Sequence, residues 1–464
     1  MKEKVIDFKN GKISTLFGRL FFPTLIGMLS VSAVTAIDGI FIGKGIGSDA
    51  IAAVNICIPI LMLLTGFGLM LGMGSSVVAS IALSKGRRKI ARAAVTNALL
   101  LVSIVSCLAN LIVLIFPREI AYALGASDRL LPMVIDYLLW FAPSLIFSLL
   151  ICVSVFALRL DGKPKLVLWA TLTASVLNVA LDWLFIFPLD CGIAGAAFAT
   201  FLSCIIAALI PLIYLFFYAD KLRLSALKLN KKGLKFFLSD IYKQCKIGSS
   251  AMLGEATLAV LFFVGNHAFM SYLGEDGVGS FGIACYYLPF IFMVGNSIAQ
   301  SAQPIISYNF GIANRQRVRS ALSISIQAAF ICGIISTAFF TLFPEILVGL
   351  FLDIKSEVAK IAIKGFPYFG SAATFFIMNL TFIGYCQSIE RVKTAACFAV
   401  LRGFVFLIPA FMLLPRFLGE RGLWLSLCFS ELLTSMAIAG VCLIAFLGRR
   451  ASGRQFLHKL FTRT

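Results

Sequence analysis

Long uninterrupted runs of apolar residues recur along the chain, separated by short polar segments. Each run has about 20 residues or more, enough to cross a bilayer core of roughly 30 Å. Inside a bilayer every backbone N–H and C=O must be paired internally, and runs without strict alternation favour helices over strands. The pattern predicts an all-α polytopic membrane protein with twelve spans, at residues 15–41, 51–83, 91–116, 131–158, 165–187, 193–217, 247–273, 279–310, 319–344, 360–387, 394–415 and 422–447.

The composition agrees with this pattern. Hydrophobic residues make up 60% of the chain, charged residues only 13%, and the mean hydropathy is +0.98, values that exclude an ordinary soluble domain. The first apolar run is too long for a signal peptide and lacks a small-residue cleavage site. We therefore expect the first run to remain in the protein as a membrane span.

The formal net charge of +19 is informative through the positions of the basic residues along the chain. When the loops are assigned alternately to the two sides of the membrane, one side collects 31 lysines and arginines and the other side 8, and Arg402, in the middle of the eleventh span, completes the 40. Basic loops stay in the cytoplasm, so the bias predicts a multi-pass protein of the inner (plasma) membrane with both termini cytoplasmic. The same charges favour contact with anionic membrane lipids, and their spread over membrane loops argues against a nucleic-acid partner.

The sequence pattern also indicates an internal repeat of two similar halves. The longest hydrophilic segment, 218–246, separates six spans from six, and a shift of 228 residues superimposes basic positions of two independent loops. Parallel halves of this kind usually surround a central site and move against each other. We expect an N-terminal six-helix lobe (1–220), a basic cytoplasmic linker (221–246), a C-terminal six-helix lobe (247–448) and a cytoplasmic tail (449–464).

Charged residues deep inside spans are costly, about 2.5–3.5 kcal/mol each on insertion scales, so they mark functional sites by default. The chain has five: Asp38, Asp182, Glu255, Arg402 and Glu431. The 228-residue shift places Asn and Ala opposite the two aspartates, so these acids occur only in the first half. This asymmetry favours a one-sided site over a scaffold that both halves would keep.

Asn178 and Asp182 are four residues apart and therefore share one helix face, and Thr200 of the sixth span and Asp38 of the first span can converge on the same place. Two carboxylates in one apolar pocket cannot both ionise cheaply, so a proton or a hard cation such as Na⁺ must neutralise the pair. The four residues are candidate ligands of a coupling cation. In the alternative interpretation, each aspartate only hydrogen-bonds a serine or threonine and holds helices together.

Other candidates remain open between two interpretations. Glu255 is either a substrate or proton site or a structural residue, and Pro23 either bends the first span about 22 Å from Asp38 or makes a static kink. Arg402 and Glu431 are expected to neutralise each other as a buried pair.

The twelve cysteines form no metal-binding pattern, and the chain has only two histidines and no HExxH or GxSxG motif, so we expect neither an enzyme nor a cofactor beyond the coupling ion.

Several segments together resemble the multidrug and toxic compound extrusion (MATE) family, in its bacterial MepA-like and DinF-like branch. They are "FFPTLIGMLSVSAVTAIDGIFIGKGIGSDAIAAVNICIPI", "LDGKPK" followed by "NVALDWLFIF" and "GIAGAAFAT", and "AQSAQPIISYNFGIANRQRV". The resemblance covers essentially all 464 residues. It implies twelve helices in two six-helix lobes that form a V, and efflux of cationic or amphipathic small molecules in exchange for Na⁺ or H⁺.

The resemblance also implies roles for particular residues. Archaeal and DinF-like members use an Asp, an Asn and Asp one turn apart, and a Thr, which match Asp38, Asn178, Asp182 and Thr200, and Pro23 matches the proline proposed to bend helix 1. NorM-type members instead use acids on helices 7 and 10. Here helix 10 carries Asn379 and no acid, and Glu255 does not clearly align, which puts a NorM-type site in doubt.

Two other functions fit the sequence less well than an antiporter. A lipid-linked oligosaccharide flippase of the wider superfamily would line its cavity with several basic residues, whereas Arg402 is the only basic residue deep inside a predicted span. A membrane-embedded enzyme lacks the expected motifs. We therefore expect an alternating-access transporter that binds a small-molecule substrate and acts as a monomer.

Overall fold

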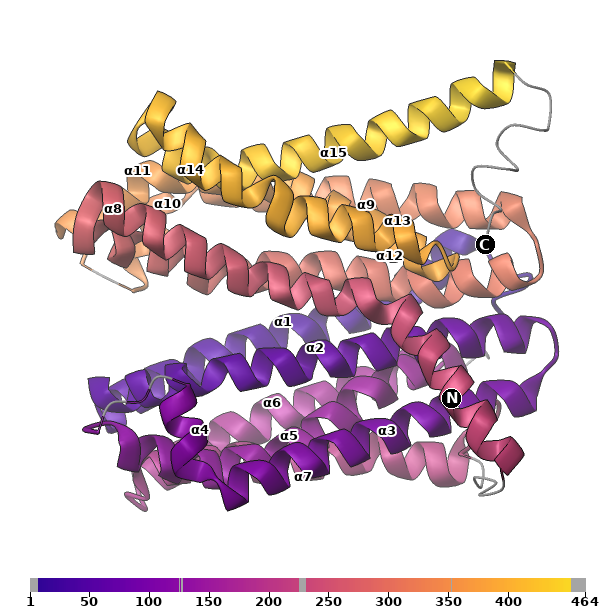
Figure 1. The fold of residues 1–464 in the computed structure, drawn as a ribbon, viewed down its shortest axis with the longest axis horizontal. Helices are drawn as coiled ribbons and strands as arrows, with labels where there is room; N and C mark the ends of the chain where they lie inside the picture. The colour runs from indigo at the N-terminus through magenta and orange to yellow at the C-terminus, as the bar shows by residue number, and fades with distance from the viewer. Residues whose placement is uncertain (1–6, 125, 127, 225–230, 352, 452–464) are drawn as a thin grey trace. The chain divides into compact units, whose positions relative to one another are not determined.

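A computed structural model describes residues 7–124, 126, 128–224, 231–351 and 353–451. Every regular element in this part of the chain is a helix (Figure 1). In chain order the elements are α1 (Ile13–Gly45), α2 (Ser48–Ser84), α3 (Arg88–Ile115), α4 (Pro117–Ala123), α5 (Leu131–Asp161), α6 (Pro164–Ile186), α7 (Gly192–Ile213), the π-helix η1 (Tyr214–Tyr218), α8 (Lys231–Gly311), α9 (Arg315–Leu342), α10 (Pro344–Gly349), α11 (Glu357–Gly370), α12 (Ala372–Ser388), α13 (Val392–Val400), the π-helix η2 (Leu401–Val405), α14 (Leu407–Leu418) and α15 (Glu420–Ala451).

The predicted all-α membrane fold is confirmed. In the described chain, 11 helical segments are long and apolar enough to span a membrane, and α11 with α12 makes a twelfth if the pair, bent by 42°, counts as one span. Pro367 lies inside α11 and removes a backbone donor just before the bend. The long segment α8 contains two of the spans, because its backbone leaves the helical conformation at Gly274.

The largest difference from the predicted boundaries is at the start of the seventh span. The sequence places that start at residue 247, but the helix begins at Lys231 and continues to Gly274 over 44 residues. Much of the predicted linker 221–246 is thus helical. Its residues 225–230, and residues 452–464 of the predicted tail, lie outside the described part of the chain.

The described chain divides into two compact units. Unit 1 comprises Met1–Ala259, Tyr286–Ala329 and Leu380–Ala396, and unit 2 comprises Val260–Cys285, Phe330–Asn379 and Cys397–Thr464. In unit 1, α5 packs against α2, α3 and α7, while α6 packs against both α1 and α7 (Figure 1). The helices that carry the four candidate cation ligands are therefore neighbours.

The core of unit 2 is aromatic. Trp424 of α15 is 2% exposed and meets Phe269 edge to face, with ring centres 4.9 Å apart, and Phe269 stacks on Phe281 at 4.6 Å. Gly365 of α11 lies directly against the Trp424 ring, where a Cβ atom would collide. Offset and edge-to-face ring pairs stabilise such a core beyond their area alone.

Candidate cation-coupling site

Three neighbouring helices of unit 1 bring the predicted cation ligands together. Asp38 comes from α1 and Thr200 from α7, and α6, which lies against both, supplies Asn178 and Asp182. Asn178 and Asp182 are 5% and 2% exposed, so the polar face of α6 points into the helix bundle. The four-residue spacing on α6 is what places the two side chains one above the other.

Asn178 is the centre of the hydrogen-bond network. With its amide oriented to suit its neighbours, Nδ2 donates to both carboxylate oxygens of Asp38, at 3.0 and 3.2 Å, and Oδ1 accepts from the Thr200 hydroxyl at 3.3 Å. The carboxyl groups of Asp38 and Asp182 lie within hydrogen-bonding reach of each other. Two carboxylates this close repel each other unless a proton or a cation lies between them, so the pair is suited to binding a positive charge.

One oxygen of this cluster lacks a partner. Asp182 Oδ1 is fully buried and accepts no hydrogen bond from the described residues. A buried, unsatisfied carboxylate oxygen is costly, and both a proton and Na⁺ would relieve the cost. A proton fits the network as it stands, whereas Na⁺ would be better held if the Asn178 amide rotated and offered its oxygen. In the described residues no group of three or more His, Cys, Asp or Glu could hold a metal ion.

A residue that sequence analysis did not select lies beside the cluster. Tyr137 of α5 is 7% exposed and lies close enough to Asp38 and Asp182 to interact with both electrostatically. Its ring stacks on Phe141 with centres 4.8 Å apart, which fixes its position. No spacing or motif signals this tyrosine, because its neighbours come from other helices.

Pro23 and Glu255 are not part of the cluster. Pro23 lies in the first half of α1, which runs as one helix from Ile13 to Gly45. Glu255 of α8 lies against Gly66 of α2 and near Cys152 of α5, and it makes no hydrogen bond or ion pair with the described residues. Gly254, one residue before Glu255, and Ala251, one turn before it, line a small cavity of about 40 Å³ in unit 1.

The cavity is polar at one wall. Three amide side chains line it, those of Asn296, Gln300 and Gln387, and Gln387 donates to Ser250 at 2.8 Å. All lining residues are uncharged: Leu69, Met73, Phe156, Ser250, Ala251, Gly254, Phe292, Asn296, Ala299, Gln300, Leu380, Ile383, Gly384 and Gln387. They come from both halves of the sequence, so the halves meet here within unit 1.

One sequence-based expectation is wrong. Arg402 was predicted to be the only basic residue inside a span, but α5 continues to Asp161 and includes Arg159, which is 3% exposed. Its guanidinium donates to Gln300 at 2.6 Å and to Thr24 at 3.2 Å and lies over the Phe156 ring. The sequence "RLDGKPK" looked like a loop, whereas the helix ends only at Gly162, which takes the left-handed conformation (φ 89°) that stops a helix.

The predicted buried pair of unit 2 is confirmed. Arg402 of η2 and Glu431 of α15 form an ion pair in which both side chains are 2% exposed. Asn379 of α12 donates to the second Glu431 oxygen at 2.8 Å, and the Arg402 guanidinium lies 3.9 Å from the centre of the Phe376 ring. Sequence analysis noted Asn379 only because helix 10 lacks an acid there, and the structure explains its amide as a partner of Glu431.

Comparison with known proteins identifies the family of the chain. The MatE family matches residues 23–184 and 251–412. The chain is 26% identical over 440 residues to the multidrug export protein MepA of Staphylococcus aureus (strain NCTC 8325 / PS 47), covering 94% of each protein. It matches the outward-facing structure of a multidrug resistance MATE family transporter with a TM-score of 0.87 at 21% identity, over 96% of this chain and 100% of the other. A mutant of the Vibrio cholerae MATE transporter VcmN matches with a TM-score of 0.83 at 21% identity, over 95% and 98% of the two chains.

The two MatE matches also bear on the internal repeat. Their starts, residues 23 and 251, are 228 residues apart, the offset that the basic loops predicted. The family therefore describes each half of the chain separately, and the two matches together cover more than half of it. The protein belongs to the MatE family, the multidrug and toxic compound extrusion transporters that its sequence resembles.

Proposed function

We propose that the protein is a secondary active efflux transporter that exports cationic or amphipathic small molecules in exchange for Na⁺ or H⁺. Two six-helix lobes alternate access to a central cavity, and the protein acts as a monomer in the inner membrane. Asp38, Asn178, Asp182 and Thr200 bind the coupling cation, and Pro23 is the point at which α1 bends during the cycle. The name of the Staphylococcus aureus relative, a multidrug export protein, supports this proposal.

The observation that carries the proposal is the pair of neighbouring carboxyl groups with one unsatisfied oxygen. Asp38 and Asp182 lie within hydrogen-bonding reach of each other in a membrane-embedded bundle, and Asp182 Oδ1 has no partner among the described residues. A site that needs a positive charge to be stable responds to the concentration of that cation. Binding and release of the cation would shift the transporter between states by its differential affinity for them.

The proposal predicts ion-driven transport by the purified protein. In proteoliposomes, ethidium should move against its gradient when a Na⁺ gradient or a pH gradient is imposed, and only one of the two should suffice. The gradient that drives transport identifies the coupling ion. Ethidium movement that responds to neither gradient would overturn the antiporter. Movement of a fluorescent lipid between leaflets would favour a flippase instead, although the uncharged lining of the cavity gives that alternative little support.

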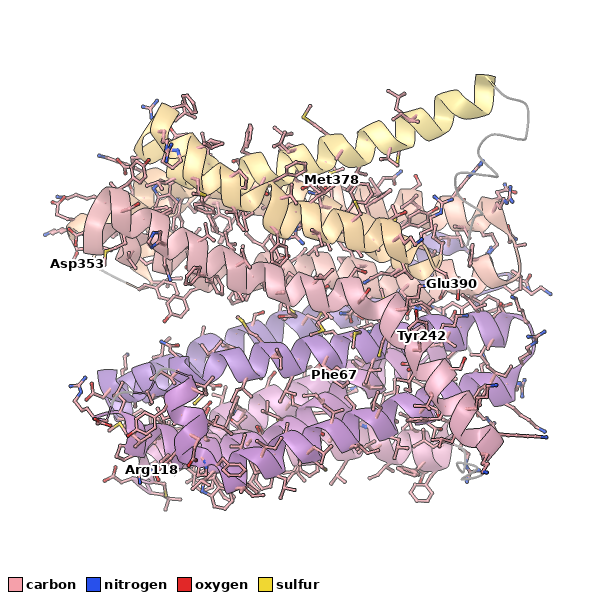
Figure 2. The ribbon with its side chains drawn as sticks, in the orientation of Figure 1. Phe67, Arg118, Tyr242, Asp353, Met378 and Glu390 are labelled. Carbon is pink, nitrogen blue, oxygen red and sulfur yellow. The ribbon has the colours of Figure 1, made fainter. Side chains whose placement is uncertain are left out.

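The direction of insertion is the second part of the proposal. Lys89 lies in the first turn of α3, and Arg118, which Figure 2 labels, lies in α4 just beyond the other end of α3. Both residues are exposed. If the 31 to 8 charge bias sets the topology, Arg118→Cys should react with an impermeant maleimide in intact cells and Lys89→Cys should not. The native cysteines are replaced by serine in both variants. The reverse labelling pattern would show that the termini face outward.

A further inference from the structure

The first four turns of α8, residues 231–246, extend beyond the apolar run that predicts the seventh span. The helix from Lys231 to Gly274 has 44 residues, a length of about 66 Å at 1.5 Å per residue. A bilayer including its headgroups is only about 40–45 Å thick. Residues 231–246, named here the α8 entry segment, therefore belong at the boundary of the membrane.

One face of the α8 entry segment is fixed to the rest of unit 1. Asp240 is 8% exposed and accepts a hydrogen bond from Asn97 of α3 at 2.7 Å. Gln244 is fully buried and donates to the Ala94 carbonyl of α3 at 3.0 Å and to Asp240 at 2.8 Å. These hydrogen bonds hold the segment against α3, so the same side chains always face away from the protein.

The outer face of the α8 entry segment carries a stripe of large apolar side chains. Leu234, Leu238 and Tyr242 are 59%, 59% and 69% exposed, and their four-residue spacing puts them on one side of the helix (Figure 2 labels Tyr242). Such side chains would be poorly placed in water, and they suit the boundary between headgroups and acyl chains.

Lysines flank this stripe. Lys231, Lys232, Lys235 and Lys246 are exposed and form no ion pair with the described residues, while Lys243 is paired with Glu390 at 2.8 Å. On a helical wheel Lys235 and Lys246 follow directly beside Tyr242, on the side away from Leu234. The one acid of the segment, Asp240, is turned inward and does not neutralise them.

We propose that the α8 entry segment is a binding site for anionic phospholipid in the leaflet where it lies. Leu234, Leu238 and Tyr242 contact the upper acyl chains, and Lys235 and Lys246 bind the phosphate and the negatively charged headgroup. The charge of the lysines matches an anionic lipid, and the direct continuation of the segment into a span places it at lipid depth. A soluble protein partner would not reach a surface that lies at the level of the lipid headgroups.

The site has a consequence for transport, which rests on the proposed function. A few residues further along the same helix, Gly248 packs directly on the Met70 carbonyl of α2, where a Cβ atom would collide. Ser250, Ala251 and Gly254 then line the cavity of unit 1. A lipid that stabilises the outer face of this helix therefore stabilises the arrangement of the cavity wall, so efflux should depend on anionic lipid.

The test measures lipid binding directly. Purified protein is titrated with phosphatidylglycerol and bound lipid is counted by native mass spectrometry. Each basic residue near a membrane surface contributes about 1 kcal/mol, so the Lys235→Gln/Lys246→Gln variant should need roughly 30-fold more lipid for half occupancy. The matched control is Arg315→Gln/Arg319→Gln, which removes two exposed charges from the start of α9, and it should bind like the wild type.

Several outcomes would overturn the lipid site. Unchanged binding in the lysine variant, or an equal loss in the arginine control, would mean that the charges act only collectively. A dimer in the mass spectrum that Leu238→Ser abolishes would show that a second copy covers the stripe.

Whether the lipid site affects transport is tested by measuring ethidium transport in phosphatidylcholine vesicles with and without phosphatidylglycerol. The wild type should be several-fold faster with phosphatidylglycerol, and the lysine variant should lose this difference. Because the mass spectra do not depend on transport, absence of transport in every lipid counts against the proposed function alone.

Discussion

Replacing Asp38 or Asp182 by asparagine is expected to abolish ion-coupled efflux, lowering ethidium transport to that of protein-free vesicles. Asparagine keeps the shape of aspartate but can neither carry the negative charge nor release the proton that the coupling needs. The protein should still fold, since a neutral amide is cheaper to bury than a carboxylate. Transport is measured in proteoliposomes, and the amount of monodisperse protein recovered from the membrane reports on folding.

Two further variants test whether the effect belongs to this cluster. Thr200→Val keeps the side-chain shape and removes the hydroxyl that meets Asn178, so it should raise the ion concentration for half-maximal transport several-fold while leaving dye binding without ion nearly unchanged. Glu255 is not part of the Asp38 cluster, because it lies against Gly66 and near Cys152. Transport by the Glu255→Gln variant should therefore still depend on the ion. If ion dependence survives Thr200→Val and disappears in Glu255→Gln, the coupling site is not the Asp38 cluster. If both asparagine variants fail to fold, the aspartates only hold the helices together.

The spans and the cluster could be predicted because both depend on simple periodicities. Twelve apolar runs stand out since lipid accepts little else, and the spacing of Asn178 and Asp182 fixes their common face without any tertiary information. That Asp38 and Thr200 join them was an inference from residue type and from the family resemblance, because periodicity relates only residues of one helix. A single sequence contains no record of which helices lie side by side.

The sequence alone could not reveal which polar side chains are buried against neighbouring helices. The five lysines of the α8 entry segment, together with Asp240 and Gln244, lower its hydropathy to that of a loop, yet Asp240 and Gln244 bond to α3. Arg159 looked like a loop residue for the same reason, although Gln300 and Thr24 bind its guanidinium. Hydropathy measures the cost of transfer into lipid, and that cost does not apply where the neighbouring helix supplies the hydrogen bonds.

The buried pair of unit 2 leads to the second large expected effect, on stability. Arg402 and Glu431 are almost completely enclosed, and removing one partner leaves the other charge without compensation. Such a loss typically costs about 3–5 kcal/mol, whereas replacing both partners by apolar residues of similar volume is often neutral. Glu431→Leu and Arg402→Met should each lower the melting temperature strongly, and the double variant should recover most of the loss.

The surrounding contacts explain why the double variant can recover. Asn379 Nδ2 also donates to the Glu431 backbone carbonyl at 2.8 Å, and its Oδ1 accepts from Ser435 at 2.8 Å, so the amide keeps partners when the carboxylate is gone. A methionine at position 402 can still lie on the Phe376 ring that the guanidinium now covers, because thioethers pack well on aromatic rings.

Thermal unfolding of the detergent-solubilised variants measures this effect. Glu357→Gln, which removes the exposed partner of Lys360, is the control and should leave the melting temperature unchanged. A double variant as unstable as the single ones would show that each side chain stabilises unit 2 through its own contacts and that the two charges do not compensate each other.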